Sequence, residues 1–173
     1  MERNLKDTVT SSFFVNEEDR SATFLLFNLS GKLVGYQVYK PDKDKTRSND
    51  PREGRYFSYA SKEDKTNYLS PFGLESLDLK NDILFVTEGI FKAVALHNVG
   101  YPAIATLTNN PKGLKNFLYI LSKTRRIIVL GDNDEGGSAT RSMGYEFVLP
   151  PARVKDIDEL SEGEIKEWLK SIL

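Results

Sequence analysis

The sequence predicts an α/β fold in which a parallel sheet flanked by helices follows a small antiparallel, β-rich subdomain. Two observations lead to this prediction. From residue 81 onwards, short apolar runs typical of strands alternate with helix-like segments, as in βαβ units. Before that position, two strand-like runs flank a turn rich in Asn, Ser and Gly, which indicates an antiparallel hairpin. We therefore expect an N-terminal subdomain, residues 1–80, with a β-hairpin and a basic, aromatic loop, and an α/β domain, residues 81–173.

The N-terminal part is expected to hold three strands and a long loop. Residues 1–20 are polar apart from 13–15 and should include a loose terminus. Strands are predicted at residues 23–27 and 33–39 and, shorter, at 56–59. The intervening residues 41–55 are rich in Lys, Asp, Asn, Arg and Pro and should form an exposed loop.

The C-terminal part is expected to alternate strands with helices. Predicted strands are residues 83–87, 103–106, 127–130 and 146–149. Predicted helices are residues 90–99 stopped by Gly100, a segment with Leu114, Phe117, Leu118 and Leu121 on one face, and a short helix after Gly137. A last helix should begin at Ser161, which can form a capping box with Glu164. His97 falls in the first helix and is expected at its surface.

Composition excludes several kinds of site. The 173 residues carry a net charge of −1, so attraction to a polyanion must come from a local patch. There is no cysteine and only one histidine, which rules out disulfides, thiolate zinc sites and histidine-rich metal sites. No apolar run approaches the roughly 20 residues of a membrane span, and no signal-peptide core is visible. We therefore expect a cytoplasmic protein that does not associate with membranes.

Acidic side chains follow two of the predicted strands. Glu88 and Gly89 come directly after residues 83–87, and the run Asp132-Asn133-Asp134-Glu135-Gly136 comes shortly after residues 127–130. In open α/β sheets, ligands bind in the crevice beyond the carboxyl ends of the strands. Carboxylates gathered there repel one another unless a cation lies between them, and oxygen ligands suit Mg²⁺ or Mn²⁺. The pattern indicates a metal-dependent site for phosphate chemistry.

The second acidic run also fits a structural turn or a nucleophile. Asp and Asn are ordinary turn residues, so the run is consistent with a turn that has no chemical role. A strand that ends in Asp-x-Asp also serves as an aspartyl nucleophile in phosphatase-type enzymes. An EF-hand loop is excluded because its twelfth position would be Met143, which cannot bind the ion. Neither the P-loop motif nor the dinucleotide-binding motif occurs.

The combination of the two motifs resembles the Toprim family, the catalytic domain of topoisomerases, bacterial and phage primases and some nucleases. Glu88-Gly89 and Asp132-Asn133-Asp134 carry the resemblance, which extends from residue 81 to the C-terminus. Two further features look like the primase branch. Residues 155–160 are similar to a late Lys-Asp-x-(Asp/Asn)-Glu segment of primases, and the hairpin at 24–39 looks like the one that precedes their Toprim fold. The resemblance implies a Toprim-like, Rossmannoid sheet.

The resemblance also implies a set of site residues. Catalysis would rest on Glu88, Asp132 and Asp134, and Mg²⁺, or Mn²⁺, would be held by Glu88, Asp132, Asp134, Asp156 and Asp158. Phosphate or nucleic acid would contact Gly89, Lys92, Asn109, Lys112 and Gly136. For Asp156 and Asp158, a solvated acidic face is an equal alternative, and for Asn109 and Lys112 a plain turn is the alternative.

Lys92 departs from the family pattern. Primase-like members commonly carry Asp at this place after Glu-Gly, and a lysine cannot bind a metal. It can instead hold a phosphate or pair with Asp132 or Asp134.

The basic, aromatic loop is a candidate nucleic-acid contact. The segment from Lys32 to Lys65, which includes this loop, carries cations such as Arg47, Arg52 and Arg55 interleaved with tyrosine and phenylalanine, as in single-strand binders. A charged loop beside ordinary strand aromatics accounts for the same residues.

The implied function is that of a Mg²⁺-dependent, primase-like nucleotidyltransferase core that acts on single-stranded DNA with nucleotides. A Toprim nuclease and a non-catalytic nucleic-acid-binding or regulatory module are the alternatives, the latter supported by Lys92. Because the chain holds no cysteine-ligated zinc module and no P-loop, a replication partner would supply template recognition or helicase activity.

Overall fold

The computed structural model describes residues 13–44, 50–60, 71–78, 80–108, 111–133 and 137–173. This part of the chain divides into two compact units, one before residue 61 and one from Pro71 onwards. Each unit is described below by itself. Among the described residues, no helix is long and apolar enough to cross a bilayer.

The first unit is an antiparallel sheet with strand order β1-β2-β3-β4. Its strands are β1 (Phe13–Asn16), β2 (Ser21–Phe27), β3 (Leu33–Tyr39) and β4 (Tyr56–Ala60). β2 and β3 form the predicted hairpin. The sequence analysis predicts no strand at Phe13–Asn16, but this segment pairs with β2, and the Phe13 ring lies 5.9 Å from that of Phe24. Between β3 and β4, Pro51–Glu53 forms a short 3-10 helix, η1.

The two faces of this sheet differ in how well they are covered. On one face Ala22, Phe24, Leu26 and Tyr39 are all buried. On the other face Leu25, Tyr36 and Tyr59 form a cross-strand row that is only partly buried. Gly35 lets β4 approach β3 closely, since a Cβ there would lie 2.2 Å from the carbonyl oxygen of Tyr59. The second face is therefore a partly exposed surface that carries aromatic rings.

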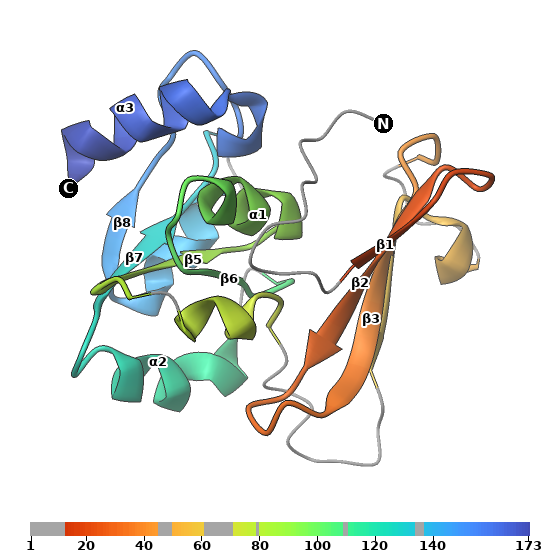
Figure 1. The fold of residues 1–173 in the computed structure, drawn as a ribbon, viewed down its shortest axis with the longest axis horizontal. Coiled ribbons are helices and arrows are strands. Elements are labelled where there is room, and N and C mark those ends of the chain that lie inside the picture. The colour runs from red at the N-terminus through yellow and green to blue at the C-terminus, as the bar shows by residue number, and fades with distance from the viewer. Residues whose placement is uncertain (1–12, 45–49, 61–70, 79, 109–110, 134–136) are drawn as a thin grey trace. The chain divides into compact units, whose positions relative to one another are not determined.

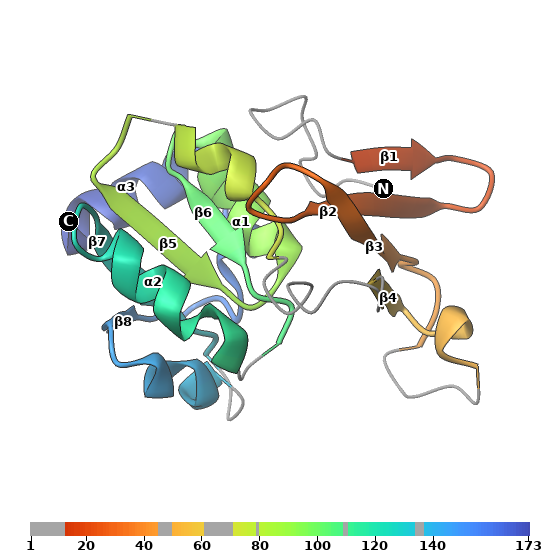
Figure 2. The ribbon, with the colours of Figure 1, turned by 90° about the horizontal axis from the view of Figure 1, so that it is seen from below.

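The second unit is a parallel sheet, as the sequence predicts, and its strand order is β6-β5-β7-β8. Its strands are β5 (Ile83–Thr87), β6 (Ala103–Ala105), β7 (Arg126–Leu130) and β8 (Glu146–Val148). Helices α1 (Ile90–Asn98) and α3 (Glu162–Ile172) cover one face, and α2 (Lys115–Leu121) covers the other (Figures 1 and 2). β5 and β7 lie in the middle of the sheet, and their continuous apolar runs are buried because helices cover both faces.

The connections of this unit explain its other elements. The helix predicted after Gly137 is a 3-10 helix, η5 (Gly137–Met143), so no α-helix lies between β7 and β8 in the described residues. The last helix begins with the predicted capping box: Ser161 N–H donates to Glu164 Oε2 at 2.8 Å, and Glu164 N–H donates to Ser161 Oγ at 3.4 Å. These bonds satisfy amide groups that a helix start leaves without partners.

His97 is buried, contrary to the expectation that it lies at the surface. Only 2% of the residue is exposed, and its Nε2 lies 2.8 Å from the carbonyl oxygen of Ala103. The physical reason is that α1 is apolar nearly all round, and a helix of that kind is covered on more than one side. Phe72 pairs with Ala105 at the edge of β6, and its ring lies 6.2 Å from the His97 ring.

Candidate cation-bridged carboxylate site

Two of the predicted acidic residues stand at the same edge of the parallel sheet. Glu88 follows β5 and Asp132 follows β7 after a single glycine, and these strands are hydrogen-bonded neighbours. Gly89 is the N-cap of α1, which begins directly after it. The carboxyl ends of parallel strands therefore bring Glu88 and Asp132 to one rim of the unit, as the sequence predicts.

Lys92 points into this rim from the first turn of α1. Its ammonium donates a hydrogen bond to Asp132 Oδ1 and lies 3.2 Å from Asp156 Oδ1. The lysine side chain is 10% exposed, and those of Asp132 and Asp156 are 18% and 28% exposed. A single buried cation thus bridges two carboxylates that lie 24 positions apart in the sequence.

The ionic environment keeps Lys92 charged. Burial alone would lower its pKa, because it disfavours the ammonium form. The hydrogen bond and the charge of Asp132, together with the charge of Asp156, outweigh burial and raise the pKa of Lys92 above its usual range. The lysine is therefore a permanent cation at the rim.

Asn133 brings Asp156 to this place. Its side-chain amide donates to the carbonyl oxygens of Pro150 (3.1 Å), Pro151 (3.1 Å) and Val154 (2.8 Å). Its backbone N–H donates to the carbonyl oxygen of Lys155 at 3.1 Å. These bonds fasten the segment before Asp156 to the end of β7. Sequence reasoning treated Asn133 only as the middle of Asp-x-Asp. The sequence does offer one sign of this role. The side-chain amide of Asn133 can donate two hydrogen bonds, and it lies between two predicted site residues to which a later segment of the chain has to come back.

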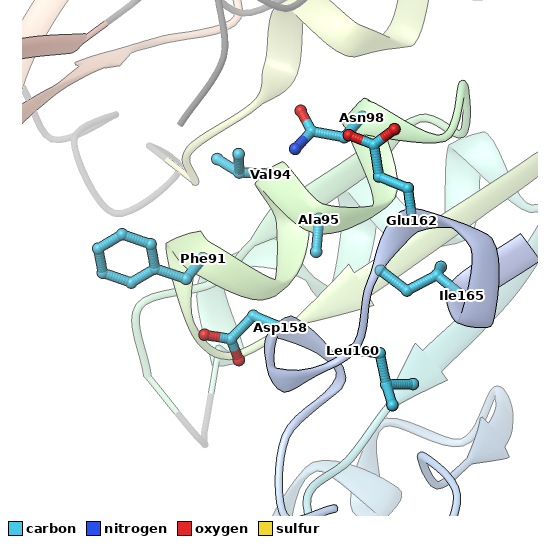
Figure 3. A pocket seen from close by; sticks show the side chains of 8 residues that line it. All are labelled: Phe91, Val94, Ala95, Asn98, Asp158, Leu160, Glu162 and Ile165. Atoms are coloured by element: carbon cyan, nitrogen blue, oxygen red, sulfur yellow. The ribbon is translucent and has the colours of Figure 1, made fainter. Parts of the chain in front are cut away.

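Asp156 and Asp158 have different surroundings. Asp156 is the N-cap of the short 3-10 helix η6 (Ile157–Glu159), which Ile157 anchors with 1% exposure. Asp158 lines a hollow of about 20 Å³ between α1 and the η6–α3 segment, enough for one water molecule. Figure 3 shows residues that line this hollow, with Phe91, Val94 and Ala95 on α1 and with Leu160 and Ile165 on the η6–α3 segment. The structure thus pairs Asp156 with Lys92, whereas Asp158 lines a hollow that Phe91 also lines.

The remaining predicted residues of the second unit fall into two groups. Lys112 begins the 3-10 helix η4 (Lys112–Leu114). Asp134, Gly136 and Asn109 lie outside the described residues, so their roles stay predictions.

The predicted arginines of the first unit hold the loop together. Arg52 forms three hydrogen bonds with the carboxylate of Asp50, at 2.7 to 3.1 Å, and this bonding lowers the pKa of Asp50 to about 2. Arg55 Nε donates to the carbonyl oxygen of Lys43 at 2.7 Å. Arg47 lies outside the described residues. The loop is therefore less positive than its count of cations suggests.

The described residues do not fit a divalent ion. Within the described ranges, no three acidic or histidine side chains come together in a way that would hold a metal. Two of the expected ligands, Asp132 and Asp156, instead share the ammonium of Lys92. Metal binding by Glu88, Asp132, Asp134, Asp156 and Asp158 therefore stays a prediction.

No known family's sequence model matches the chain, and no curated protein matches it in sequence. Several solved structures, however, are similar to it in three dimensions. A DnaG catalytic core aligns with a TM-score of 0.66 and 20% identity, over 87% of this chain and 51% of that one. The primase fragment of the bacteriophage T7 primase-helicase protein aligns with a TM-score of 0.65 and 15% identity, over 93% and 66%. A DnaG primase catalytic domain bound to single-stranded DNA aligns with a TM-score of 0.61 and 18% identity, over 94% and 57%.

At these identities the likeness shows the fold. The alignments cover most of this chain, and the chain in turn spans between 51% and 66% of the length of those three structures. The parallel sheet with its flanking helices and the preceding antiparallel sheet are thus the architecture of bacterial and phage primase catalytic cores.

Proposed function

We propose that this protein binds single-stranded DNA through a primase-core fold. The observation that carries the proposal is that the likeness covers 87% to 94% of the chain, and so includes the antiparallel sheet as well as the parallel one. One of the similar structures is a primase domain bound to single-stranded DNA. A replication partner that supplies template recognition or helicase activity is part of the same proposal.

The partly exposed face of the first unit supports this proposal. The rings of Tyr36 and Tyr59 stack with centroids 5.5 Å apart, and Phe57 lies edge-on to Tyr36 at 6.2 Å. Tyr59 is 51% exposed. Single-strand binders use exposed rings of this kind as platforms on which bases stack, with little preference for sequence. The rings are fixed by cross-strand pairing, so they lose little freedom when a base binds.

The test is the affinity of Tyr59→Ala for a fluorescently labelled oligo-dT, measured by anisotropy. Loss of one base–ring stack of about 1–3 kcal/mol should weaken binding about 5- to 150-fold. The matched control is Tyr119→Ala on α2, because Tyr119 is 59% exposed and lies in the other unit. The control should bind as the natural chain does. Absence of binding by the natural chain at low salt, or equal losses in both variants, would contradict the proposal.

Primer synthesis, a metal-dependent nucleotidyl transfer, is the second candidate. The position of Glu88 and Asp132 at one edge of the sheet favours it, whereas the ammonium of Lys92 between Asp132 and Asp156 opposes metal binding there. The protein is incubated with labelled single-stranded template, ribonucleotides and Mg²⁺ or Mn²⁺. Products that require ribonucleotides and Asp132 would support nucleotidyl transfer. A shortened template would indicate a nuclease, and an unchanged template would leave binding alone as the function.

A further inference from the structure

We propose that the ammonium of Lys92 is a built-in cation that takes the place of a divalent ion between Asp132 and Asp156. The natural chain should then bind Mg²⁺ and Mn²⁺ weakly at this rim, and replacing Lys92 by an acidic residue should create a divalent-cation site. The proposal concerns cations and not DNA, so it can fail independently of the proposed function.

The position of Lys92 on α1 directs its side chain to the rim. Lys92 is the third residue of the helix, and helical side chains lean towards the helix N-terminus. The Cε of Lys92 lies 3.9 Å from the position that a Cβ on Gly89 would take, so the lysine side chain folds back over the N-cap residue. The ammonium therefore ends beside the strand termini and not on the outer side of the helix.

The two carboxylates are held in place by elements other than Lys92. Asp132 follows β7 after a single glycine, and the last residue of β7, Leu130, is 1% exposed. Asp156 is fixed by η6 and by the three carbonyl contacts of Asn133. The geometry that attracts a cation therefore does not depend on the lysine, and it should persist when the lysine is replaced. Two carboxylates at this spacing repel each other unless a cation lies between them.

A divalent ion and the ammonium compete for the same space. Carboxylate oxygens hold Mg²⁺ or Mn²⁺ at about 2.0–2.2 Å, and the ammonium already contacts one oxygen of each carboxylate. An ion that entered would have to displace Lys92 or tolerate a positive charge at contact distance, which is strongly unfavourable in a partly buried site. Lys92→Asp removes that charge and adds two oxygen ligands. Mg²⁺ commonly binds through few carboxylates and retains several waters.

The test measures Mn²⁺ binding at fixed ionic strength by the electron paramagnetic resonance signal of free Mn²⁺. Lys92→Asp should bind Mn²⁺ at least about tenfold more tightly than the natural chain, because a like charge next to the ion is gone. Mn²⁺ should also raise the melting temperature of this variant more than that of the natural chain. Adding Asp132→Asn to Lys92→Asp should remove the gain, which locates the new site at the rim.

Lys166→Asp is the matched control, since Lys166 is an exposed lysine of α3 and undergoes the same change of charge. It should bind Mn²⁺ as the natural chain does. If Lys92→Asp does not fold without metal, Mn²⁺ should restore its folding. Mn²⁺ binding is then measured on Lys92→Met as well, a folded variant in which a neutral side chain replaces the lysine. The proposal is overturned if the natural chain already binds Mn²⁺ as tightly as Lys92→Asp. It is equally overturned if neither Lys92 variant binds Mn²⁺ or is refolded by it.

Discussion

Asn133 and Lys92 together organise the rim, and they differ in how far the sequence reveals them. The departure from the family pattern at Lys92 is visible in the sequence, and pairing with Asp132 was one of its predicted alternatives; the structure shows this pair. The role of Asn133 depends on carbonyl groups of residues 150, 151 and 154, which come close only in the folded chain. The predicted strand ends indicate where carboxylate side chains come together. They do not indicate which side chain holds the later segment, residues 150–156, at the end of β7.

His97 shows how burial changes the behaviour of a single residue. Burial lowers the pKa of His97, because the charged imidazolium loses its hydration, although the hydrogen bond to Ala103 and the charge of Glu75 act in the opposite direction. At a pH below the usual value of 6.5, the unfolded chain takes up a proton that the folded chain does not. The contribution of His97 to stability is therefore present above pH 6.5 and is lost as the pH falls towards the folded-state pKa.

We predict that the free energy of unfolding of the natural chain falls more steeply than that of His97→Gln between pH 6.5 and the lower, folded-state pKa of His97. The difference is at most about 1.4 kcal/mol for each pH unit, the value for one proton. Gln keeps a side-chain donor for Ala103 but has no group that titrates. Urea unfolding at a series of pH values measures the difference, and parallel pH profiles for the two proteins would show that His97 is not the group responsible.

Patterns of apolar residues predicted most elements of the fold, and the exceptions have physical causes. β5 and β7 were readily predicted, since a central strand covered on both faces needs a continuous apolar run. β1 was missed because three of its four side chains are exposed, so its sequence carries little burial signal. η5 was predicted only as a short helix, because apolar spacing over so few residues does not distinguish a 3-10 helix from an α-helix.

The capping box of α3 gives a prediction at the scale of an element. Hydrogen bonds from the Ser161 hydroxyl and N–H hold the pKa of Glu164 at about 2, so the carboxylate is charged at neutral pH. Ser161→Ala should lower the free energy of unfolding by about 1 kcal/mol, the usual effect of losing an N-cap side chain. Urea denaturation measures the change. Ser171→Ala, at the other end of α3, is the control and should change stability by less than about 0.5 kcal/mol.

At the scale of the whole molecule, charge limits how the protein can hold DNA. The net charge is −1, and two of the described cations of the loop lie in ion pairs, Lys43 with Glu53 and Arg52 with Asp50. Binding that relied on phosphate contacts would need these cations to leave their partners. Stacking on the aromatic face has no such requirement. The balance of charge therefore favours a binding mode in which bases contribute more than phosphates.

This balance predicts a shallow dependence of DNA binding on salt. For single strands, the logarithm of the binding constant falls with the logarithm of salt concentration with a slope of about −0.7 per phosphate neutralised. With about three phosphate contacts or fewer, the slope should be no steeper than about −2. Anisotropy titrations with oligo-dT between about 50 and 200 mM NaCl measure it. A slope of about −4 or steeper would mean that phosphate contacts dominate. The basic loop, and not the Tyr36–Tyr59 surface, would then be the main contact with DNA.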